Sequence, residues 1–363
     1  MDGSTRLTLL TASFGDTQML RTESLVEVAT HLGHEVTVVS TQPGEVLPSL
    51  ADHAVARHLR HVTEPELEEL VADGTDLLVA VKALQVSLGL GHRVSRRTGT
   101  PMLLDIDDPD LEVRTVSSGR DHRESARLMW RDRALLPSHL RLAVTARRTP
   151  STVSNPVLQR RWGGTVLPHA RVDPGDGAAH VSDVPQVAFV GTTRAHKGLP
   201  LLREAVARLA DQGWRLLVTA DAPPDSRPWE TWVGPLDGSL DAAALTAACD
   251  VVVIPSEAMG YGSAQLPLKL VDAMLMGRAV VVSDVGPLPW AVGSAGDVFR
   301  SGSVEDLVRV LRPLADPTVR GERGRSSREL AIGRYTVQAV APAFARAVGG
   351  VLSQPEAGAD QHP

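Results

Sequence analysis

The sequence predicts an α/β protein of two domains, each a doubly wound parallel sheet with helices on both faces. Its 363 residues exceed the roughly 250 to 300 residues over which a single hydrophobic core usually extends. Short, continuous apolar runs alternate with stretches whose apolar residues have helical spacing, which is typical of strands buried under crossover helices. A segment rich in Gly, Pro, Asp and Ala at residues 172–185 interrupts this alternation and predicts the boundary between the domains.

The first half begins with a strand, a helix and a second strand. Apolar runs at residues 7–11 and 35–40 flank a stretch at 20–32 that has helical spacing. We therefore expect a Rossmann-like N-terminal domain at residues 1–173, followed by a linker at 174–185. Further strands of this domain are expected at residues 76–81, 101–106 and 140–145, with helical material between them.

The second half predicts another Rossmann-like domain, at residues 186–335. Its apolar runs are continuous rather than alternating, as in strands that are buried on both faces. A final amphipathic helix at 336–352 is expected to pack back towards the N-terminal domain, and the polar tail at 353–363 is expected to be disordered. The predicted strands lie at residues 187–190, 214–218, 251–254 and 279–283.

The composition excludes several classes of function. A net charge of -6 and 3% aromatic residues provide neither a general attraction to nucleic acid nor a stacking platform for it. The single cysteine, Cys249, cannot form a disulfide framework, which fits a reducing cytoplasm. No segment approaches the roughly 18 apolar residues of a membrane span. An arginine-rich stretch at 92–161 leaves peripheral contact with the inner membrane face open, with a solvated surface as the alternative.

Lysine is rare in this chain, which has only Lys82, Lys197 and Lys269 among its 37 Lys and Arg residues. Where arginine replaces lysine on solvated surfaces, a retained lysine indicates a position that needs a compact charge on a flexible stem. Lys197 and Lys269 both occur in local sequences that suit an anion. The alternative is that three residues fell there by chance.

Residues 267–277 predict a short helix, with Pro267 at its start and Gly277 just past its end. The N–H groups and the dipole at a helix N-terminus favour an anion such as a diphosphate. Lys269 and Asp272 are three residues apart and therefore share a helix face, the lysine towards phosphate and the aspartate towards ribose hydroxyls. The alternative is an exposed Lys–Asp pair that binds no ligand.

The loop at residues 191–198, Gly-Thr-Thr-Arg-Ala-His-Lys-Gly, follows a predicted buried strand and precedes a predicted helix. It is therefore expected at the carboxyl edge of the second sheet, where ligands bind in doubly wound folds. Gly191 and Gly198 allow the backbone to approach a phosphate, and Arg194 and Lys197 supply positive charge. The loop is neither a Walker loop nor a dinucleotide fingerprint, so nucleotide hydrolysis and hydride transfer are not supported.

The order of these motifs resembles that of the GT-B glycosyltransferases, most closely the retaining enzymes of glycosyltransferase family 4 (group 1). The resemblance covers nearly the whole chain and implies a GT-B type fold, in which two Rossmann-like domains face a central cleft. It also implies transfer of a sugar from a nucleoside diphosphate donor. The motifs that carry it are the first loop with Gly15, residues 33–40, 153–155 and 166–169 with Asp173, the loop at 191–198, and residues 254–283.

The resemblance implies a site for the donor diphosphate in the second half. Two of its residues, Arg194 and Lys269, would also act in catalysis by stabilising the leaving diphosphate in place of a metal. No metal and no cofactor would be required, and the donor would be linked to UDP or GDP. The residues that would bind the diphosphate are Gly191, Arg194, Lys197, Leu268 and Lys269.

The remainder of the donor would lie on neighbouring residues. By resemblance, Asp272 binds the ribose, Gly234 lies near the base, and Glu257 supplies a carboxylate to the sugar. The sequence departs from the family pattern at two places. Thr192 follows the loop glycine where the family often has arginine, and Ala264 stands eight residues before Asp272 where the family often has glutamate.

Acceptor-side candidates lie in the first half. Asp107 and Asp108 follow a predicted strand and either line the acceptor side of the cleft, with Asp108 a candidate catalytic residue, or cap the following turn. Lys82 also ends a strand and either faces the cleft or lies on the surface, and Gly15 is a further acceptor-side candidate. Residues 105–107 are not interpreted as an Asp-x-Asp metal motif, because the phosphate-binding loops lie in the other half.

These inferences predict a cytoplasmic glycosyltransferase that uses a nucleotide-sugar donor and an unknown acceptor, with retention and without a metal. Two alternatives stay open, a nucleotide-sugar epimerase of the same fold and a nucleotide-sugar-binding subunit without activity. Ala264 and Asp272 are the residues that favour the inactive subunit. Hydrolase and metalloenzyme functions lack support, because the sequence has no nucleophile elbow with a Ser-His-Asp order and no His-Glu-x-x-His or paired-cysteine spacing.

Overall fold

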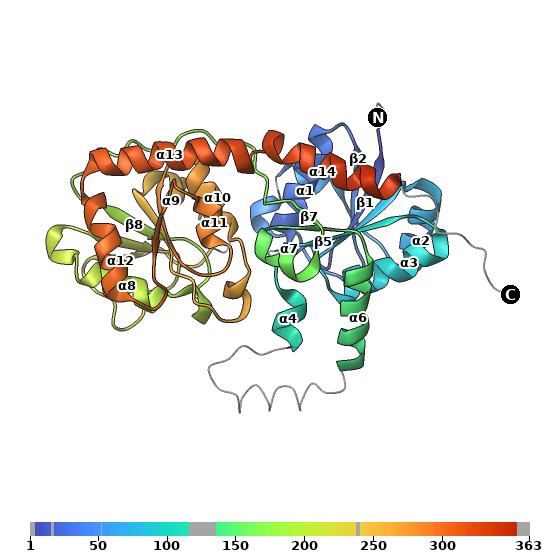
Figure 1. Cartoon of the computed structure of the whole chain (residues 1–363), viewed down its shortest axis with the longest axis horizontal. Helices are drawn as coiled ribbons and strands as arrows, with labels where there is room; N and C mark the ends of the chain where they lie inside the picture. Colours follow the sequence, from blue (N-terminus) through green and yellow to red (C-terminus); the bar gives the residue numbers. More distant parts are fainter. Residues whose placement is uncertain (1–3, 16–17, 52, 116–135, 237–239, 354–363) are drawn as a thin grey trace. The chain divides into compact units, whose positions relative to one another are not determined.

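The computed structural model describes residues 4–15, 18–51, 53–115, 136–236 and 240–353. The chain divides into two compact units (Figure 1). The C-terminal unit is Arg171–Thr336, and the N-terminal unit combines Met1–Ala170 with Val337–Pro363. The chain therefore crosses between the units twice, and its last helix belongs to the N-terminal unit.

The N-terminal unit is built on a seven-stranded sheet in the order β3-β2-β1-β4-β5-β6-β7. All neighbouring strands are parallel, and in the middle Leu9 pairs with Val38 on one side and Val79 on the other. β4 and β5 are buried along their whole length, because helices cover both faces of a parallel sheet. The strands are β1 (Arg6–Leu10), β2 (Glu35–Ser40), β3 (Leu59–His61), β4 (Leu77–Val81), β5 (Met102–Ile106), β6 (Ser151–Val153) and β7 (Thr165–Val166).

Helices surround this sheet, and the last of them, α14, packs against α1 (Figure 1). Val340, Phe344 and Val348 of α14 are buried in one core with α1 and the sheet, because the apolar residues of α14 recur with helical spacing. The α-helices are α1 (Met19–His31), α2 (Glu64–Gly74), α3 (Leu90–Thr98), α4 (Asp110–Thr115), α6 (Leu136–Arg148), α7 (Pro156–Trp162) and α14 (Val337–Leu352). Single turns of 3-10 helix lie at η1 (Pro48–Leu50) and η2 (Ala54–His58), and a π-helical turn lies at η3 (Gln85–Gly89).

The C-terminal unit is built on a six-stranded parallel sheet in the order β10-β9-β8-β11-β12-β13. Both faces carry a hydrophobic core, as the continuous apolar runs predict. β8 and β11, at the centre, are adjacent in the sheet although β9 and β10 come between them in the chain. The strands are β8 (Gln186–Phe189), β9 (Arg215–Val218), β10 (Glu230–Trp232), β11 (Val251–Ile254), β12 (Ala279–Ser283) and β13 (Asp297–Phe299).

Different helices cover the two faces of this second sheet. Leu202 and Leu307, from α8 and α12, lie in one core, whereas Leu270 and Met274 of α10 lie in the other. The long helix α13 packs against α10. The helices are α8 (Leu199–Ala207), α9 (Ala242–Ala248), α10 (Leu268–Leu275), α11 (Leu288–Val292), α12 (Val304–Leu311) and α13 (Pro317–Tyr335), with 3-10 turns η5 (Ala195–Lys197), η6 (Ala210–Gln212), η7 (Gly260–Ser263) and η8 (Arg312–Ala315).

The strand expected at residues 140–145 is wrong, because these residues lie within helix α6. Leu142 and Ala146, four residues apart, are buried, whereas Leu140 and Val144 are exposed. Burial therefore follows the period of a helix. The strand of this region is β6, which begins only at Ser151.

The segment at 174–185, expected to be a linker, forms neither helix nor strand but is hydrogen-bonded to the C-terminal unit. The N–H of Gly177 donates to the carbonyl of Met276 at 3.0 Å, and the Arg278 guanidinium donates to the carbonyl of Ala178 at 2.7 Å. Its Gly- and Pro-rich composition thus reflects irregular backbone and not a lack of contacts. The tail expected to be disordered lies outside the described residues from position 354 onward.

No helix in the described ranges combines the length and the apolar character needed to cross a membrane.

Candidate functional site

Two of the three lysines converge at the carboxyl edge of the C-terminal sheet. Gly191 follows the end of β8 with a φ of 116°, and its N–H donates to Thr219 Oγ1 at 2.7 Å. A Cβ atom at this glycine would lie 3.9 Å from the Nζ atoms of both Lys197 and Lys269. The fold therefore brings together two ammonium groups that are 72 residues apart in the chain.

Lys269 has an unusual electrostatic environment. It lies in the first turn of α10, and its Nζ lies 4.3 Å from the ring centroid of Phe189. Among the residues that the structure describes, no carboxylate lies within ion-pair distance of it, and Asp272 on the same helix instead pairs with Arg171. Burial, together with the charge of Lys197, lowers the pKa of Lys269 to about 7. Within the described part of the chain, the Lys269 ammonium is therefore not compensated by a paired carboxylate.

Two further cations lie on the loop at 191–198. Lys197 is partly exposed, and its Nζ donates to Thr192 Oγ1 at 3.0 Å. Arg194 is exposed at the start of the turn η5. The loop thus carries two cations, and Lys197 converges with Lys269 of α10 on Gly191, an arrangement that suits a multiply charged anion.

The loop is held in place by close backbone packing. Gly198 has a φ of 68°, and a Cβ atom there would lie 1.9 Å from the carbonyl oxygen of Pro255. The N–H of Glu257 donates to the carbonyl of His196 at 2.8 Å, and the rings of His196 and Tyr261 have centroids 6.3 Å apart. The loops that follow β8 and β11 therefore support each other, and glycine is required at position 198.

Replacing Gly198 by alanine is expected to destabilise the protein by at least about 1 kcal/mol. Alanine is strained in the left-handed backbone conformation of this position, and its Cβ atom would clash with the carbonyl oxygen of Pro255. The free energy of unfolding in urea measures this loss. Gly213→Ala is the matched control, since Gly213 has a φ of 92° but open space around its missing Cβ. An equal loss of unfolding free energy in the two variants would show that the contact with Pro255 adds nothing to the cost of the substitution.

Asp272, predicted to face ribose, is bound by a residue that the sequence did not indicate. Its Oδ1 accepts a hydrogen bond from Arg171 Nε at 3.0 Å, with both side chains partly exposed. Arg171 is itself fixed, because its N–H donates to the carbonyl of Tyr335 at 2.8 Å. The carboxylate is thereby oriented by an ion pair rather than by Lys269.

The remaining donor-side positions lie on the same unit. Gly234 follows β10 with a φ of 90°, and its N–H donates to the carbonyl of Ala220 at 3.1 Å. Leu268 and Glu257 are partly exposed. Ala264 is completely buried, so its side chain offers no exposed contact surface at that position.

The acceptor-side candidates of the N-terminal unit form a buried ion-pair cluster. Lys82 is 5% exposed, and its Nζ lies 2.9 Å from Asp107 Oδ1 and 2.6 Å from Asp108 Oδ2. Lys82 is therefore not a surface lysine. Its φ of 67° is rare for a residue with a side chain and marks local strain at the carboxyl end of β4. Gly15, the other candidate, is exposed, and a Cβ atom there would lie 2.8 Å from the carbonyl oxygen of Glu45.

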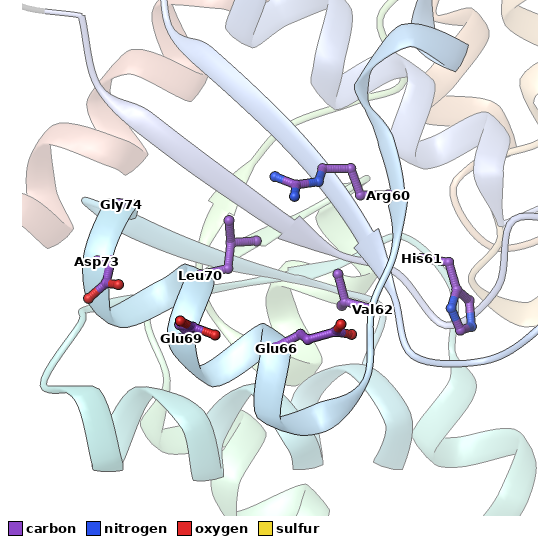
Figure 2. A pocket seen from close by; sticks show the side chains of 8 residues that line it. All are labelled: Arg60, His61, Val62, Glu66, Glu69, Leu70, Asp73 and Gly74. Atoms are coloured by element: carbon purple, nitrogen blue, oxygen red, sulfur yellow. The ribbon is translucent and has the colours of Figure 1, made fainter.

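A surface pocket of about 410 Å³ lies elsewhere on the N-terminal unit, between the edge strand β3 and helix α2 (Figure 2). Glu69 and Asp73 of α2 and Arg60 of β3 line it. Glu66 also lines it but is already engaged, because its carboxylate accepts a hydrogen bond from the N–H of Thr63 at 2.7 Å. None of the site residues predicted from the sequence lies in this pocket.

Sequence reasoning missed Phe189, Thr219 and Arg171. Thr219 carries a usable signal, since it is a polar residue directly after the apolar run of β9, at the ligand-binding edge of the sheet. Phe189 resembles any other apolar strand residue, and Arg171 any other surface arginine. Their contacts with Lys269 and Asp272 depend on the tertiary structure.

Comparison with known proteins finds a family match within the C-terminal unit. Residues 184–316 match the family model for group 1 glycosyl transferases. No curated protein sequence matches the chain. The matched region contains the loop at 191–198 and helix α10, the two elements that carry the converging lysines.

Solved structures extend the likeness to nearly the whole chain. Sucrose-phosphate synthase from Thermosynechococcus elongatus has 17% sequence identity and a TM-score of 0.69, with 96% of this chain and 99% of that chain covered. Anabaena HepE in complex with UDP and glucose has 16% identity and a TM-score of 0.71, with 95% and 100% covered. A glycosyltransferase from Rickettsia africae has 10% identity and a TM-score of 0.69, with 97% and 100% covered. The fold is therefore GT-B, with two Rossmann-like sheets.

Proposed function

We propose that the chain is a glycosyltransferase that moves a sugar from a nucleoside diphosphate donor to an acceptor hydroxyl, with retention and without a metal. One observation carries the proposal. Lys197 and Lys269 converge on Gly191 within a group 1 glycosyltransferase domain, and Lys269 has no described carboxylate at ion-pair distance. A diphosphate would supply the missing negative charge at this point.

The diphosphate would interact with the N-terminus of α10 and with three cations, Arg194, Lys197 and Lys269. Arg194 and Lys269 would act in catalysis, because charge accumulates on the leaving diphosphate as the bond to the sugar breaks. Fixed positive groups lower the energy of that state without rearranging. These residues would therefore provide the charge stabilisation that a metal provides elsewhere.

The other groups of the donor would contact further residues of the C-terminal unit. Asp272 would accept hydrogen bonds from the ribose hydroxyls while Arg171 stays bound to its Oδ1 atom. Gly234 would lie beside the base, Leu268 beside the diphosphate, and Glu257 towards the sugar. UDP is the first nucleotide to test, because HepE was solved with UDP and glucose, and GDP is the second.

Retention would result from attack on the same face from which the diphosphate leaves. The acceptor oxygen forms a bond to the anomeric carbon, the bond from that carbon to the diphosphate oxygen breaks, and the hydroxyl proton passes to the departing phosphate. No protein nucleophile is required in this scheme. On the acceptor side, the exposed Gly15 and the cluster of Lys82, Asp107 and Asp108 are the candidates, and Asp108 is the candidate catalytic residue.

The test is incubation of the protein with a panel of UDP- and GDP-sugars and acceptors in the presence of a chelator. We expect release of nucleoside diphosphate that depends on the acceptor, with retained configuration in the product. An isomerised sugar without acceptor would instead indicate an epimerase. Nucleotide binding without turnover on any acceptor would indicate an inactive subunit, and strict dependence on a divalent metal would overturn the charge-stabilisation scheme.

Binding of a UDP-sugar is expected to weaken as the pH rises above about 7, where Lys269 loses its proton in the free protein. A bound diphosphate stabilises the ammonium form and raises its pKa, so binding takes up a proton between the free and the bound pKa. Below the free pKa the lysine is already charged and this dependence disappears. Calorimetric titration in buffers of different ionisation enthalpy measures the proton uptake. If binding takes up no protons anywhere in this pH range, Lys269 does not bind the diphosphate.

A further inference from the structure

Phe189 and Lys269 come from opposite layers of the C-terminal unit. Phe189 ends β8 and is completely buried in the core beneath α8 and α12, whereas the apolar residues of α10 lie in the core on the other face of the sheet. Lys269 nevertheless places its Nζ 4.3 Å from the Phe189 ring centroid. Its side chain therefore extends from the start of α10 across the carboxyl edge of the sheet to a ring of the opposite layer.

Among the described residues, the Phe189 ring is the side chain that attracts the Lys269 ammonium. No described carboxylate lies within ion-pair distance of Lys269, and the charged group that acts on it, Lys197, repels it. The face of an aromatic ring carries partial negative charge and attracts a cation, most strongly where water is excluded. The burial that makes the ammonium unfavourable thus also strengthens its attraction to the ring.

We propose that Phe189 is a positioning residue of the diphosphate site, whose ring holds the Lys269 ammonium beside Gly191 before the donor arrives. This inference rests on the proposed function of the site, since it assigns the diphosphate as the anion that Lys269 meets. A flexible lysine stem loses conformational freedom when it binds a phosphate. The ring sets that geometry in advance, so less freedom is lost on binding.

The first test needs no ligand, because the chain has only three lysines and their Cε resonances can be followed in a selectively labelled protein. Lys269 is expected to titrate near 7 in the wild type and at a lower pH in Phe189→Leu, which removes the ring but keeps an apolar core residue. Phe299→Leu is the matched control. Phe299 is also a buried phenylalanine at the end of a strand in the same core and has no lysine over its ring. An unchanged Lys269 titration in Phe189→Leu would overturn the proposal.

The second test measures the binding of UDP-glucose at about pH 6 and about pH 8. Phe189→Leu is expected to weaken binding roughly tenfold at the higher pH, with a smaller loss at the lower pH where the ammonium is restored. Phe299→Leu should leave the affinity near that of the wild type. Equal losses at both pH values, or equal losses in the two variants, would show a general packing role and overturn the proposal.

A ring-fluorinated phenylalanine at position 189 separates charge from shape, because fluorine reduces the negative potential of the ring face while the ring keeps its packing. Affinity is expected to fall with fluorination in the wild type and to stay constant in Lys269→Met, which has no ammonium to hold. A wild type that binds no nucleoside diphosphate would refute the proposed function and the assigned anion. The lysine titration would still decide whether the ring holds the ammonium.

Discussion

Lys269→Met is expected to weaken the binding of UDP-glucose about 10- to 100-fold, because a charge-assisted hydrogen bond to the diphosphate contributes about 1.5 to 3 kcal/mol. Methionine keeps the length and apolar stem of lysine but has no ammonium. The same change removes a partly desolvated charge that has no described carboxylate within ion-pair distance. The unfolding temperature is therefore expected to stay the same or to rise, which distinguishes a lost ligand contact from a damaged fold.

Calorimetric titration with UDP-glucose measures the affinity, and differential scanning calorimetry measures the unfolding temperature. Arg215→Ala is the matched control, since Arg215 is an exposed cation at the first residue of β9, the opposite end of the strand from the site. It removes one positive charge from the same unit without touching the loop at 191–198. If both variants bind equally well, the site has been misplaced.

Arg21→Met is expected to destabilise the N-terminal unit by about 3 to 5 kcal/mol, the cost of leaving one partner of a buried ion pair uncompensated. Arg21 is 1% exposed and Asp105 is completely buried. Two guanidinium nitrogens of Arg21 donate to the Asp105 carboxylate at 2.8 and 2.7 Å. The same guanidinium donates to the carbonyls of Leu167 and Pro168, so it joins α1, β5 and the segment after β7.

Calorimetry should show this loss as a decrease of roughly 10 °C in the unfolding temperature of the N-terminal unit. Adding Asp105→Leu to Arg21→Met removes the unpaired carboxylate and is expected to recover most of the stability. Arg6→Met is the control, because Arg6 forms the same kind of two-point pair with Asp76 but both side chains are exposed. A loss in Arg6→Met as large as that in Arg21→Met would show that burial does not set the cost.

The donor half of the candidate site was largely accessible from the sequence, because its signals are local. A cationic loop after an apolar run and a lysine at a predicted helix start each indicate the carboxyl edge of a sheet, and the structure brings both lysines to Gly191. Partners contributed by other elements were not accessible. Phe189, Thr219 and Arg171 contact the predicted residues only because their strands and segments lie next to them in space.

Buried ion pairs show the same limit in the N-terminal unit. The sequence offered Lys82 as either a cleft residue or a surface residue, and Asp107 and Asp108 as either ligand-facing or capping residues. In the structure they bind one another in a buried cluster, an arrangement that local spacing does not indicate because β4 and β5 become neighbours only in the sheet. The prediction of a strand at 140–145 failed for a related reason: its apolar residues alternate in sequence, but within residues 137–148 the helix α6 buries Leu142 and Ala146 and exposes Leu140 and Val144.

By itself, the sequence determined that the chain forms two parallel α/β units. It also determined the local positions of two lysines, with Lys197 in a loop after a strand and Lys269 at the start of a helix. Hydrophobic periodicity and helix-end residues act over a few positions, so one chain is enough to detect them. Only the tertiary structure decided what each lysine meets. Lys197 and Lys269 lie beside the same glycine, Lys269 over an aromatic ring and Lys82 among aspartates, because charge and burial depend on groups that are distant in the chain and adjacent only after folding.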